Sequence, residues 1–191
     1  MSNSNLFHAT KQAVFLDRDG TINVEKDYLY RPEEFEFIPG AAEAIRRLNR
    51  AGFLVVVVTN QSGVARGYYT EHEVLQLHRH IEQLLFRADA RIDAWYYCPH
   101  YPSGQHPYNL DCDCRKPRTG MLEQAARDLG IDLSRSWMVG DKQVDVEAGV
   151  AAGCRPLLVL TGYGADASLK VPATVPRCPD LAAATELIAA V

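Results

Sequence analysis

The stretch AVFLDRDGTIN at residues 13–23 runs from four apolar residues directly into two aspartates separated by one arginine. A short, nearly continuous apolar run is typical of a strand that is buried on both faces of a sheet. Alternate residues of an extended chain project to the same side, so Asp17 and Asp19 are expected near one point just past the end of this strand. The same alternation predicts that Arg18 points away from that point and does not contact a substrate.

The close pair of aspartates needs a compensating charge, because two neighbouring carboxylates repel each other. A divalent cation that prefers oxygen ligands, such as Mg²⁺, fits this requirement. The alternative is a surface turn, in which aspartate acts as a turn former and Gly20 supplies the tight bend. The residues at the other strand ends help to decide between these interpretations.

The composition bounds the kind of protein. The 191 residues are 47% hydrophobic, which is enough for one well-buried domain, expected over residues 13–191. Residues 1–12 are expected to be a flexible leader, since they lack the apolar stretch of an export signal. A net charge of −4 offers no basic surface for nucleic acid, and no segment has the apolar length of a membrane span.

The cysteine count gives an expectation about the compartment. Five cysteines are an odd number in a chain without an export signal, which argues against a disulfide framework. We therefore expect a cytoplasmic protein with a metal site. The short polar termini favour a monomer.

Apolar runs alternate with segments of helical periodicity along the chain. The expected strands are residues 13–16, 53–58, 94–97, 137–139 and 156–160. The expected helices are residues 41–51, 71–86, 121–129 and 144–152. Their end signals are Thr70 as an N-terminal cap, and Gly52, Gly130 and Gly153 as C-terminal glycines. This alternation predicts an α/β fold with a central parallel sheet, whose ligands bind beyond the carboxyl ends of the strands.

Polar residues follow a second strand end. The strand at residues 53–58 leads into Thr59, Asn60, Gln61 and Ser62. Their hydroxyl, amide and backbone N–H groups are donors suited to phosphoryl oxygens. Taken alone, Thr59 has an ordinary interpretation as a helix cap.

Charged residues occupy the corresponding places further along. Arg115 and Lys116 precede a helix and offer cations for a phosphate, and the strand at residues 137–139 is followed by Asp141 and Asp145. Singly, Lys116 could be a solvated charge, and the two aspartates could begin an ordinary helix. Because all of them occur in order on successive strand ends, we expect one shared site.

The loop at residues 98–119 is long for a compact domain and contains a cluster of metal-binding residue types. Cys98, His100, Cys112 and Cys114 supply three thiolates and one imidazole, which make a complete tetrahedral zinc shell. A closed shell predicts a structural zinc that fixes the loop. The alternatives are free thiols in a reducing compartment, or His106 in place of the fourth ligand.

The two remaining cysteines have no such partners. Cys154 and Cys178 are expected to be small buried or surface residues.

The ordered motifs resemble those of the haloacid dehalogenase superfamily of phosphotransferases. The signature of that superfamily is DxDGT, then a threonine or serine at a strand end, then a lysine, then an acidic pair. Here it reads as residues 17–21, Thr59, Lys116, and Asp141 with Asp145. The resemblance implies a three-layer, Rossmann-like fold.

Within the superfamily, five segments resemble the heptose bisphosphate phosphatases. They are FLDRDGTIN, VVTNQSGVARG, YYCPHYP, CDCRKPRTGML and MVGDKQVD, and the resemblance covers residues 14–160. The histidinol-phosphate phosphatases are related and share much of this pattern. The interval between residues 21 and 58 is short, so only a minimal cap is expected over the site.

The resemblance implies chemical roles for the acidic residues. Asp17 is expected to be the nucleophile that forms an aspartyl-phosphate, and Asp19 the general acid and base. Mg²⁺ is expected to bind a carboxylate oxygen of Asp17, the backbone carbonyl of Asp19 and the carboxylate of Asp141.

The resemblance also implies roles for the phosphate-binding residues. Thr59, Asn60 and Lys116 are expected to bind the transferring phosphoryl group. Asp145 is expected to orient Lys116 or a metal-bound water.

Further residues around the expected site are candidates for substrate contacts. Glu25, Asp27 and Tyr28 are expected to bind sugar hydroxyls, with solvated surface residues as the alternative. Arg66 and Arg115 are expected to meet a second phosphate. The other candidates are Asn60, Gln61, Ser62 and Lys142.

The resemblance implies a Mg²⁺-dependent phosphatase that removes the 7-phosphate of a heptose 1,7-bisphosphate. Its product, a heptose 1-phosphate, would serve the synthesis of nucleotide-activated heptose for lipopolysaccharide or another surface glycan. The expected partner is therefore a small phosphorylated sugar, without nucleic acid or membrane. The alternatives are a histidinol-phosphate phosphatase and a catalytically silent binding module built on the zinc loop.

Overall fold

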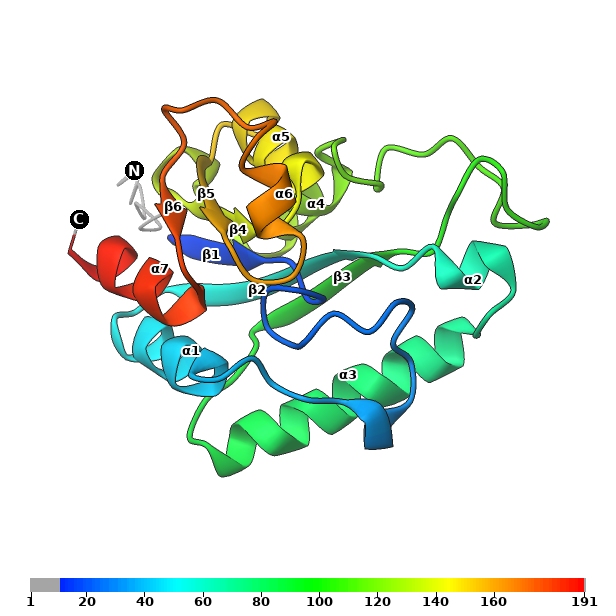
Figure 1. The fold of residues 1–191 in the computed structure, drawn as a ribbon, viewed down its shortest axis with the longest axis horizontal. Helices are drawn as coiled ribbons and strands as arrows, with labels where there is room; N and C mark the ends of the chain where they lie inside the picture. Colours follow the sequence, from blue (N-terminus) through cyan, green and yellow to red (C-terminus); the bar gives the residue numbers. More distant parts are fainter. Residues whose placement is uncertain (1–10, 191) are drawn as a thin grey trace, which may run out of the picture.

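The computed structural model describes residues 11–190, and Figure 1 shows them arranged around one central sheet. The sheet is parallel throughout, and its strand order is β3-β2-β1-β4-β5-β6. The strands are β1 (Ala13–Leu16), β2 (Leu54–Asn60), β3 (Ala94–Cys98), β4 (Trp137–Gly140), β5 (Arg155–Val159) and β6 (Arg177–Cys178). Residues 1–10 of the expected leader lie outside the described residues.

Helices cover both faces of the sheet (Figure 1). The α-helices are α1 (Ala41–Arg50), α2 (Gly63–Arg66), α3 (Glu71–Arg87), α4 (Gly120–Leu129), α5 (Gln143–Ala151), α6 (Gly164–Ala167) and α7 (Leu181–Ala189). Two short 3-10 helices are η1 (Pro32–Glu34) and η2 (Leu133–Arg135). Helices α1, α3 and α7 pack on one face, and α4 and α5 pack on the other. The predicted three-layer α/β fold is confirmed.

The alternation of side chains along β1 explains why the strand is apolar throughout. Val14 and Leu16 pack into the core beneath α1, α3 and α7, whereas Ala13 and Phe15 pack into the opposite core beneath α4. All four residues are completely buried. A strand in the middle of a parallel sheet needs an apolar side chain at every position, as the sequence predicted.

The end signals of the helices act as expected. Thr70 caps α3 in a reciprocal capping box with Glu73. Gly52, Gly130 and Gly153 have positive φ angles of 86°, 69° and 80° at the ends of α1, α4 and α5.

Two parts of the fold differ from the prediction. The strand expected at residues 53–58 is β2, which continues through Asn60 because Thr59 and Asn60 pair with the last two residues of β3. The C-terminal β6 and α7 were not predicted. The strand has only two residues, and α7 is marked by Asp180, whose side chain accepts a hydrogen bond from the Ala183 N–H.

The topology brings the predicted strand ends together. Strand β1 lies between β2 and β4, and its last residue, Leu16, is in register with Val57 and Val139. The chain turns away from β1 towards β2 on one side and later returns to β4 on the other, which opens a crevice at the carboxyl edge. No helix among residues 11–190 is long and apolar enough to cross a membrane.

His78 of α3 is a buried titratable residue away from this edge. Its side chain is 3% exposed and stacks on Trp95 with 4.2 Å between the ring centroids. Neither ring nitrogen has a hydrogen-bond partner among the described residues. Burial lowers the pKa of His78 from its ordinary value of 6.5 to about 2.

We predict that His78 makes the protein sensitive to acid. Below about pH 6.5 the unfolded chain binds a proton at this histidine and the folded chain does not, so the free energy of unfolding falls by about 1 kcal/mol per pH unit. Urea unfolding between about pH 7 and about pH 5 measures this loss. A His78→Phe variant should lose less stability over this range than the wild type, whereas a variant of the exposed His72, His72→Gln, should behave as the wild type does. Equal slopes for wild type and His78→Phe would refute the prediction.

Candidate active site

A pocket of about 440 Å³ lies at the carboxyl edge of the sheet. Every predicted catalytic and substrate-binding residue lines it except Arg66. Asp141 does not line the pocket either, because it is completely buried just beyond the end of β4. The residues that the sequence placed on successive strand ends, with the exception of Asp141, therefore share one cavity.

Lys116 lies at the centre of a buried cluster of charges. Its Nζ is 3.0 Å from Asp17 Oδ1 and 2.7 Å from Asp145 Oδ1, and it donates a hydrogen bond to the Val58 carbonyl at 2.7 Å. Burial alone would lower the pKa of Lys116. The negative charges of Asp145 and Asp17 have a larger, opposite effect, so the pKa of Lys116 is raised above its ordinary value. Lys116 therefore carries a fixed positive charge beside Asp17.

Asp145 also holds the start of α5. Its Oδ2 accepts a hydrogen bond from the Lys142 N–H, just before the helix, at 2.9 Å. Its Oδ1 contacts the Lys116 ammonium, so the same carboxylate stabilises the helix start and pairs with Lys116. This contact agrees with the expectation that Asp145 orients Lys116.

Asp17, Asp141 and Asp145 form a group that could hold a cation. One carboxylate oxygen from each lies within 4.8 Å of the others. Asp141 Oδ2 accepts a hydrogen bond from the Tyr163 N–H at 2.8 Å, whereas Oδ1 has no hydrogen-bond partner although the residue is completely buried. Burial and the neighbouring Asp17 raise the pKa of Asp141 to about 8.

These observations fit Mg²⁺. Asp141 Oδ1, which is 3.7 Å from the Lys142 ammonium and accepts no hydrogen bond, is a buried carboxylate oxygen of the hard kind that this ion prefers. The approach to Asp141 is kept open by glycine, because a Cβ atom at Gly20 or Gly162 would lie 2.1 Å or 2.3 Å from Asp141 Oδ2. Asp17 and Asp141 would hold the ion, and the backbone carbonyl of Asp19 remains a predicted ligand.

The side chain of Asp19 is held by donors on several sides. Arg18 contacts both carboxylate oxygens through its NH2 group, at 2.9 Å and 2.8 Å. Asn23 Nδ2 donates to Oδ1 at 3.0 Å, and Gln61 Nε2 donates to Oδ2 at 3.0 Å. Burial would raise the pKa of Asp19, but Arg18 and these hydrogen bonds lower it.

The direction of Arg18 differs from the prediction. Its guanidinium was expected to point away from the site, but it lies behind Asp19 and also donates to the Leu29 carbonyl at 2.9 Å. The strand alternation no longer applies there, because the backbone turns after Asp17 and the Arg18 carbonyl accepts hydrogen bonds from the N–H groups of Ile22 and Asn23. Arg18 is completely buried and does not line the pocket, so it is not a substrate contact.

The residues at the carboxyl end of β2 reach the pocket, and two of them, Asn60 and Gln61, are already engaged with protein groups. The Asn60 side chain binds the backbone of Lys116, since its Nδ2 donates to the carbonyl at 3.0 Å and its Oδ1 accepts from the N–H at 3.1 Å. The Gln61 amide donates to Asp19 and to Thr59 Oγ1. Ser62 lines the pocket, and its predicted contact with phosphate stays a prediction.

Charged and aromatic side chains form the rim of the pocket. Lys142 Nζ pairs with Glu25 Oε2 at 2.9 Å, and the Tyr163 hydroxyl donates to Asp27 Oδ1 at 3.0 Å. Asp27 and the adjacent Tyr28 have positive φ angles of 45° and 63°, which is unusual for residues with a side chain. These contacts hold the loop that carries the three predicted sugar-binding residues.

The two predicted phosphate-binding arginines stack on one tyrosine. The guanidinium carbon of Arg66 lies 4.1 Å from the ring centroid of Tyr101, and that of Arg115 lies 5.2 Å from the same centroid. Arg66 also approaches the ring of Tyr28, at 5.8 Å. Arg66 therefore lies close to the rim, although it does not line the pocket.

Sequence reasoning missed several lining residues. They are Tyr69, Pro117, Val144 and Tyr163. Tyr163 follows β5 closely, so the strand-end rule applied to residues 161–163 would have found it. Tyr69 lies between α2 and α3, and no pattern in the sequence indicates that its hydroxyl reaches Gln61.

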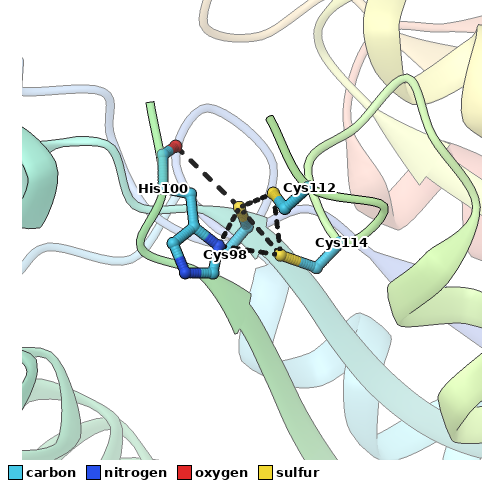
Figure 2. Close-up of side chains that lie close together, drawn as sticks. All are labelled: Cys98, His100, Cys112 and Cys114. Carbon is cyan, nitrogen blue, oxygen red and sulfur yellow. Dashed lines mark hydrogen bonds between the residues drawn. The ribbon is translucent and has the colours of Figure 1, made fainter. Parts of the chain in front are cut away.

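The side chains of the predicted zinc ligands converge on one point, as Figure 2 shows. The sulfur atoms of Cys98, Cys112 and Cys114 are 3.1 Å to 3.5 Å apart, and His100 Nδ1 is 3.3 Å from Cys114 Sγ. The four ligand atoms all lie within 4.8 Å of one another, and no disulfide joins the cysteines.

This arrangement fits a tetrahedral zinc ion. Zn–S bonds of about 2.3 Å place ligand sulfurs roughly 3.8 Å apart, close to the spacing observed. His100 completes the group, and His106 is not part of it. Cys154 and Cys178 are buried and lie outside the group, as expected.

Most of the chain is similar to proteins of known function. A family model described as HAD-hydrolase-like matches residues 113–184. The chain is 47% identical over 152 residues to the D-glycero-beta-D-manno-heptose-1,7-bisphosphate 7-phosphatase of Haemophilus influenzae, which covers 79% of this chain and 83% of the relative. It is 49% identical over 152 residues to the protein of the same name from Escherichia coli K12, with 78% and 80% covered.

Solved structures agree with these matches. The D,D-heptose 1.7-bisphosphate phosphatase from B. bronchiseptica, complexed with magnesium and phosphate, has a TM-score of 0.85 and 37% identity, with 93% of this chain and 97% of that chain covered. The D,D-heptose 1,7-bisphosphate phosphatase from Burkholderia thailandensis has a TM-score of 0.69 and 34% identity, with 92% and 97% covered.

We predict that Gly20→Ala abolishes Mg²⁺ binding, because the new Cβ would lie 2.1 Å from Asp141 Oδ2. The matched control is Gly52→Ala, which has almost the same φ angle (86° against 83°) but no atom within 4 Å of the new Cβ. Both variants should lose about 1–2 kcal/mol of stability through the left-handed backbone. Mg²⁺ should raise the melting temperature of the wild type and of Gly52→Ala only. An equal rise in Gly20→Ala would contradict the assigned site.

We also predict about one bound zinc ion per chain, held by the four Cys and His ligands. Elemental analysis of the purified protein should show zinc in the wild type and in Cys154→Ser, and its loss in Cys112→Ser. Removal of the ion by a chelator should lower the melting temperature, because the ion cross-links the loop. Zinc retained at full occupancy in Cys112→Ser would rule out this ligand set.

Proposed function

Because the chain belongs to the HAD-like family that includes the D-glycero-beta-D-manno-heptose-1,7-bisphosphate 7-phosphatases, we propose that it removes the 7-phosphate of a heptose 1,7-bisphosphate. The observation that carries the proposal is the pairing of Asp17 with the buried Lys116 in a pocket that Asp19 also lines. The pairing keeps the Asp17 carboxylate near a fixed cation, and Asp19 offers a second carboxylate for proton transfer.

In the first step the Asp17 carboxylate attacks the phosphorus atom of the 7-phosphate. A new bond forms between the carboxylate oxygen and phosphorus, and the bond from phosphorus to the sugar oxygen breaks. Asp19 gives a proton to that oxygen, so the sugar leaves as an alcohol and not as a strongly basic alkoxide. The enzyme then carries an aspartyl-phosphate on Asp17.

In the second step a water oxygen attacks the phosphorus of the aspartyl-phosphate. Asp19 accepts the proton of this water, and the bond between phosphorus and the Asp17 oxygen breaks. Inorganic phosphate leaves, Asp17 returns to the carboxylate, and Asp19 is again protonated. The proton lent to the sugar is thereby recovered from water.

The remaining charges bind and orient the phosphoryl group. Lys116 and the Thr59 hydroxyl would contact its oxygens, and the gain is greatest as charge spreads over them in the transition state. Mg²⁺ held by Asp17, Asp141 and the Asp19 carbonyl would offset the negative charge of the phosphate as it approaches the carboxylates.

The rim supports a substrate with a second phosphate. Glu25 is paired with Lys142, and Asp27 accepts from Tyr163, so the acidic groups of the rim are already engaged. Arg115 lines the pocket and, together with Arg66, offers planar cations that suit a phosphate. Histidinol phosphate has one phosphate and a positively charged amine, which these arginines would repel.

The setting of the reaction is part of the same proposal. The cluster of unoxidised cysteines suits a reducing compartment, which supports the cytoplasm. The product would keep its 1-phosphate for conversion to a nucleotide-activated heptose, a precursor of lipopolysaccharide or another surface glycan.

We predict that the purified protein with Mg²⁺ releases phosphate from a heptose 1,7-bisphosphate and prefers one of its two anomers. Phosphate release should be compared for both anomers and for histidinol phosphate. Asp17→Asn should remove activity by about 10⁴-fold or more, since the amide is a poor nucleophile.

Each alternative result has a definite meaning. Faster release from histidinol phosphate would refute the substrate proposed here and leave the catalytic roles intact. No release from any of the three compounds by a folded, zinc-loaded protein would favour the binding module over the enzyme.

A further inference from the structure

Gln61 connects the two functional halves of the pocket through its side-chain amide. Its Nε2 donates one hydrogen bond to Asp19 Oδ2 at 3.0 Å and another to Thr59 Oγ1 at 2.9 Å. The residue is 2% exposed, so its polar atoms are almost entirely enclosed by protein. Both protons of the amide nitrogen are therefore committed to Asp19 and Thr59.

The orientation of this amide is fixed by its neighbours. Gln61 Oε1 receives the Tyr69 hydroxyl at 2.6 Å and the Arg18 NH2 group at 3.4 Å. Arginine can only donate hydrogen bonds, so Oε1 must be the atom that faces Arg18, and Nε2 is then the atom that faces Asp19. In that orientation the Tyr69 hydroxyl has to be the donor to Oε1.

The arrangement also determines where the Thr59 proton goes. Because Thr59 Oγ1 accepts a hydrogen bond from Gln61, its own hydroxyl proton is directed to another acceptor. Thr59 lines the pocket, so a phosphoryl oxygen in the pocket is available as that acceptor.

We propose that Gln61, oriented by Tyr69, is a positioning residue that holds Asp19 in place for proton transfer to the leaving sugar oxygen. This inference rests on the function proposed above. It gives Gln61 a different role from the expected contact with substrate, because a buried amide whose protons are both committed has none left for a sugar. Tyr69 acts one step further back, because its hydroxyl donates to Gln61 and not to Asp19.

The proposal predicts a dependence on the leaving group. A sugar leaves as a basic alkoxide unless it receives a proton, whereas p-nitrophenol leaves as a stable anion and needs none. If Asp19 is displaced, hydrolysis of the sugar phosphate should therefore slow more than hydrolysis of p-nitrophenyl phosphate. A disturbance of phosphate binding through Thr59 would slow both substrates in proportion.

The experiment compares kcat/KM for the heptose bisphosphate and for p-nitrophenyl phosphate in Gln61→Leu and Tyr69→Phe. The value for the heptose bisphosphate divided by that for p-nitrophenyl phosphate should fall about tenfold in Gln61→Leu and about threefold in Tyr69→Phe. These losses are smaller than the roughly 10²-fold or more that general acid catalysis supplies, because Asp19 itself is retained. For the sugar, kcat should fall while KM stays nearly unchanged.

Tyr30→Phe is the matched control. The Tyr30 ring stacks on Tyr69 with 5.2 Å between centroids, but its hydroxyl contacts Arg31 and not Gln61. This variant should keep the wild-type ratio. Tyr69→Phe keeps the buried aromatic ring, so we expect this variant to fold. Its melting temperature, compared with that of the wild type, checks this.

Two results would overturn the proposal. An equal loss with both substrates would mean that Gln61 only shapes the pocket, and a rise in KM for the sugar with unchanged kcat would make it a substrate contact. A wild type that fails to hydrolyse heptose bisphosphate refutes the proposed function and not this inference. The same ratio would then be measured with an alkyl phosphate that the wild type does hydrolyse.

Discussion

The ammonium of Lys116, enclosed by Asp17, Asp145 and the Val58 carbonyl, is the contact on which the rest of the site depends. A buried ammonium is strongly unfavourable unless close anions and acceptors compensate it, so this one side chain requires both carboxylates to converge on it. Three ionised carboxylates beside the Lys116 ammonium would leave two negative charges. The Lys142 ammonium, 3.7 Å from Asp141 Oδ1, offsets part of them, and a divalent cation would offset the rest. The Mg²⁺ proposed for this site therefore agrees with the charges that the fold buries together.

The parts of the site that depend on backbone topology were predictable from the sequence. Continuous apolar runs indicated strands buried on both faces, and parallel strands end at one edge, so Asp17 and Thr59 had to lie near each other and near Asp141. The four Cys and His residues were predictable for a different reason. Their number and spacing match a zinc shell whatever the path of the loop between them.

The parts that depend on the reach of long side chains were not predictable. The alternation rule gave the wrong direction for Arg18, because the strand ends at Leu16 and the chain turns at once. The sequence placed Asn60 and Gln61 at the site but could not show that their amides bind Lys116 and Asp19. Such hydrogen bonds join residues 42 to 56 positions apart, and only the packed fold determines them.

The loop that carries the predicted zinc ligands is connected directly to Lys116, the residue proposed to bind phosphate. Cys98 ends β3 in register with Asn60 of β2, and Cys114 lies two residues before Lys116. The amide of Asn60 in turn binds both backbone groups of Lys116. A zinc ion that joins Cys98 to Cys114 would therefore fix the Lys116 backbone from the side of the sheet and from the side of the loop. The ion need not touch the substrate to affect phosphate binding, because it would limit the positions that the Lys116 ammonium can take beside Asp17.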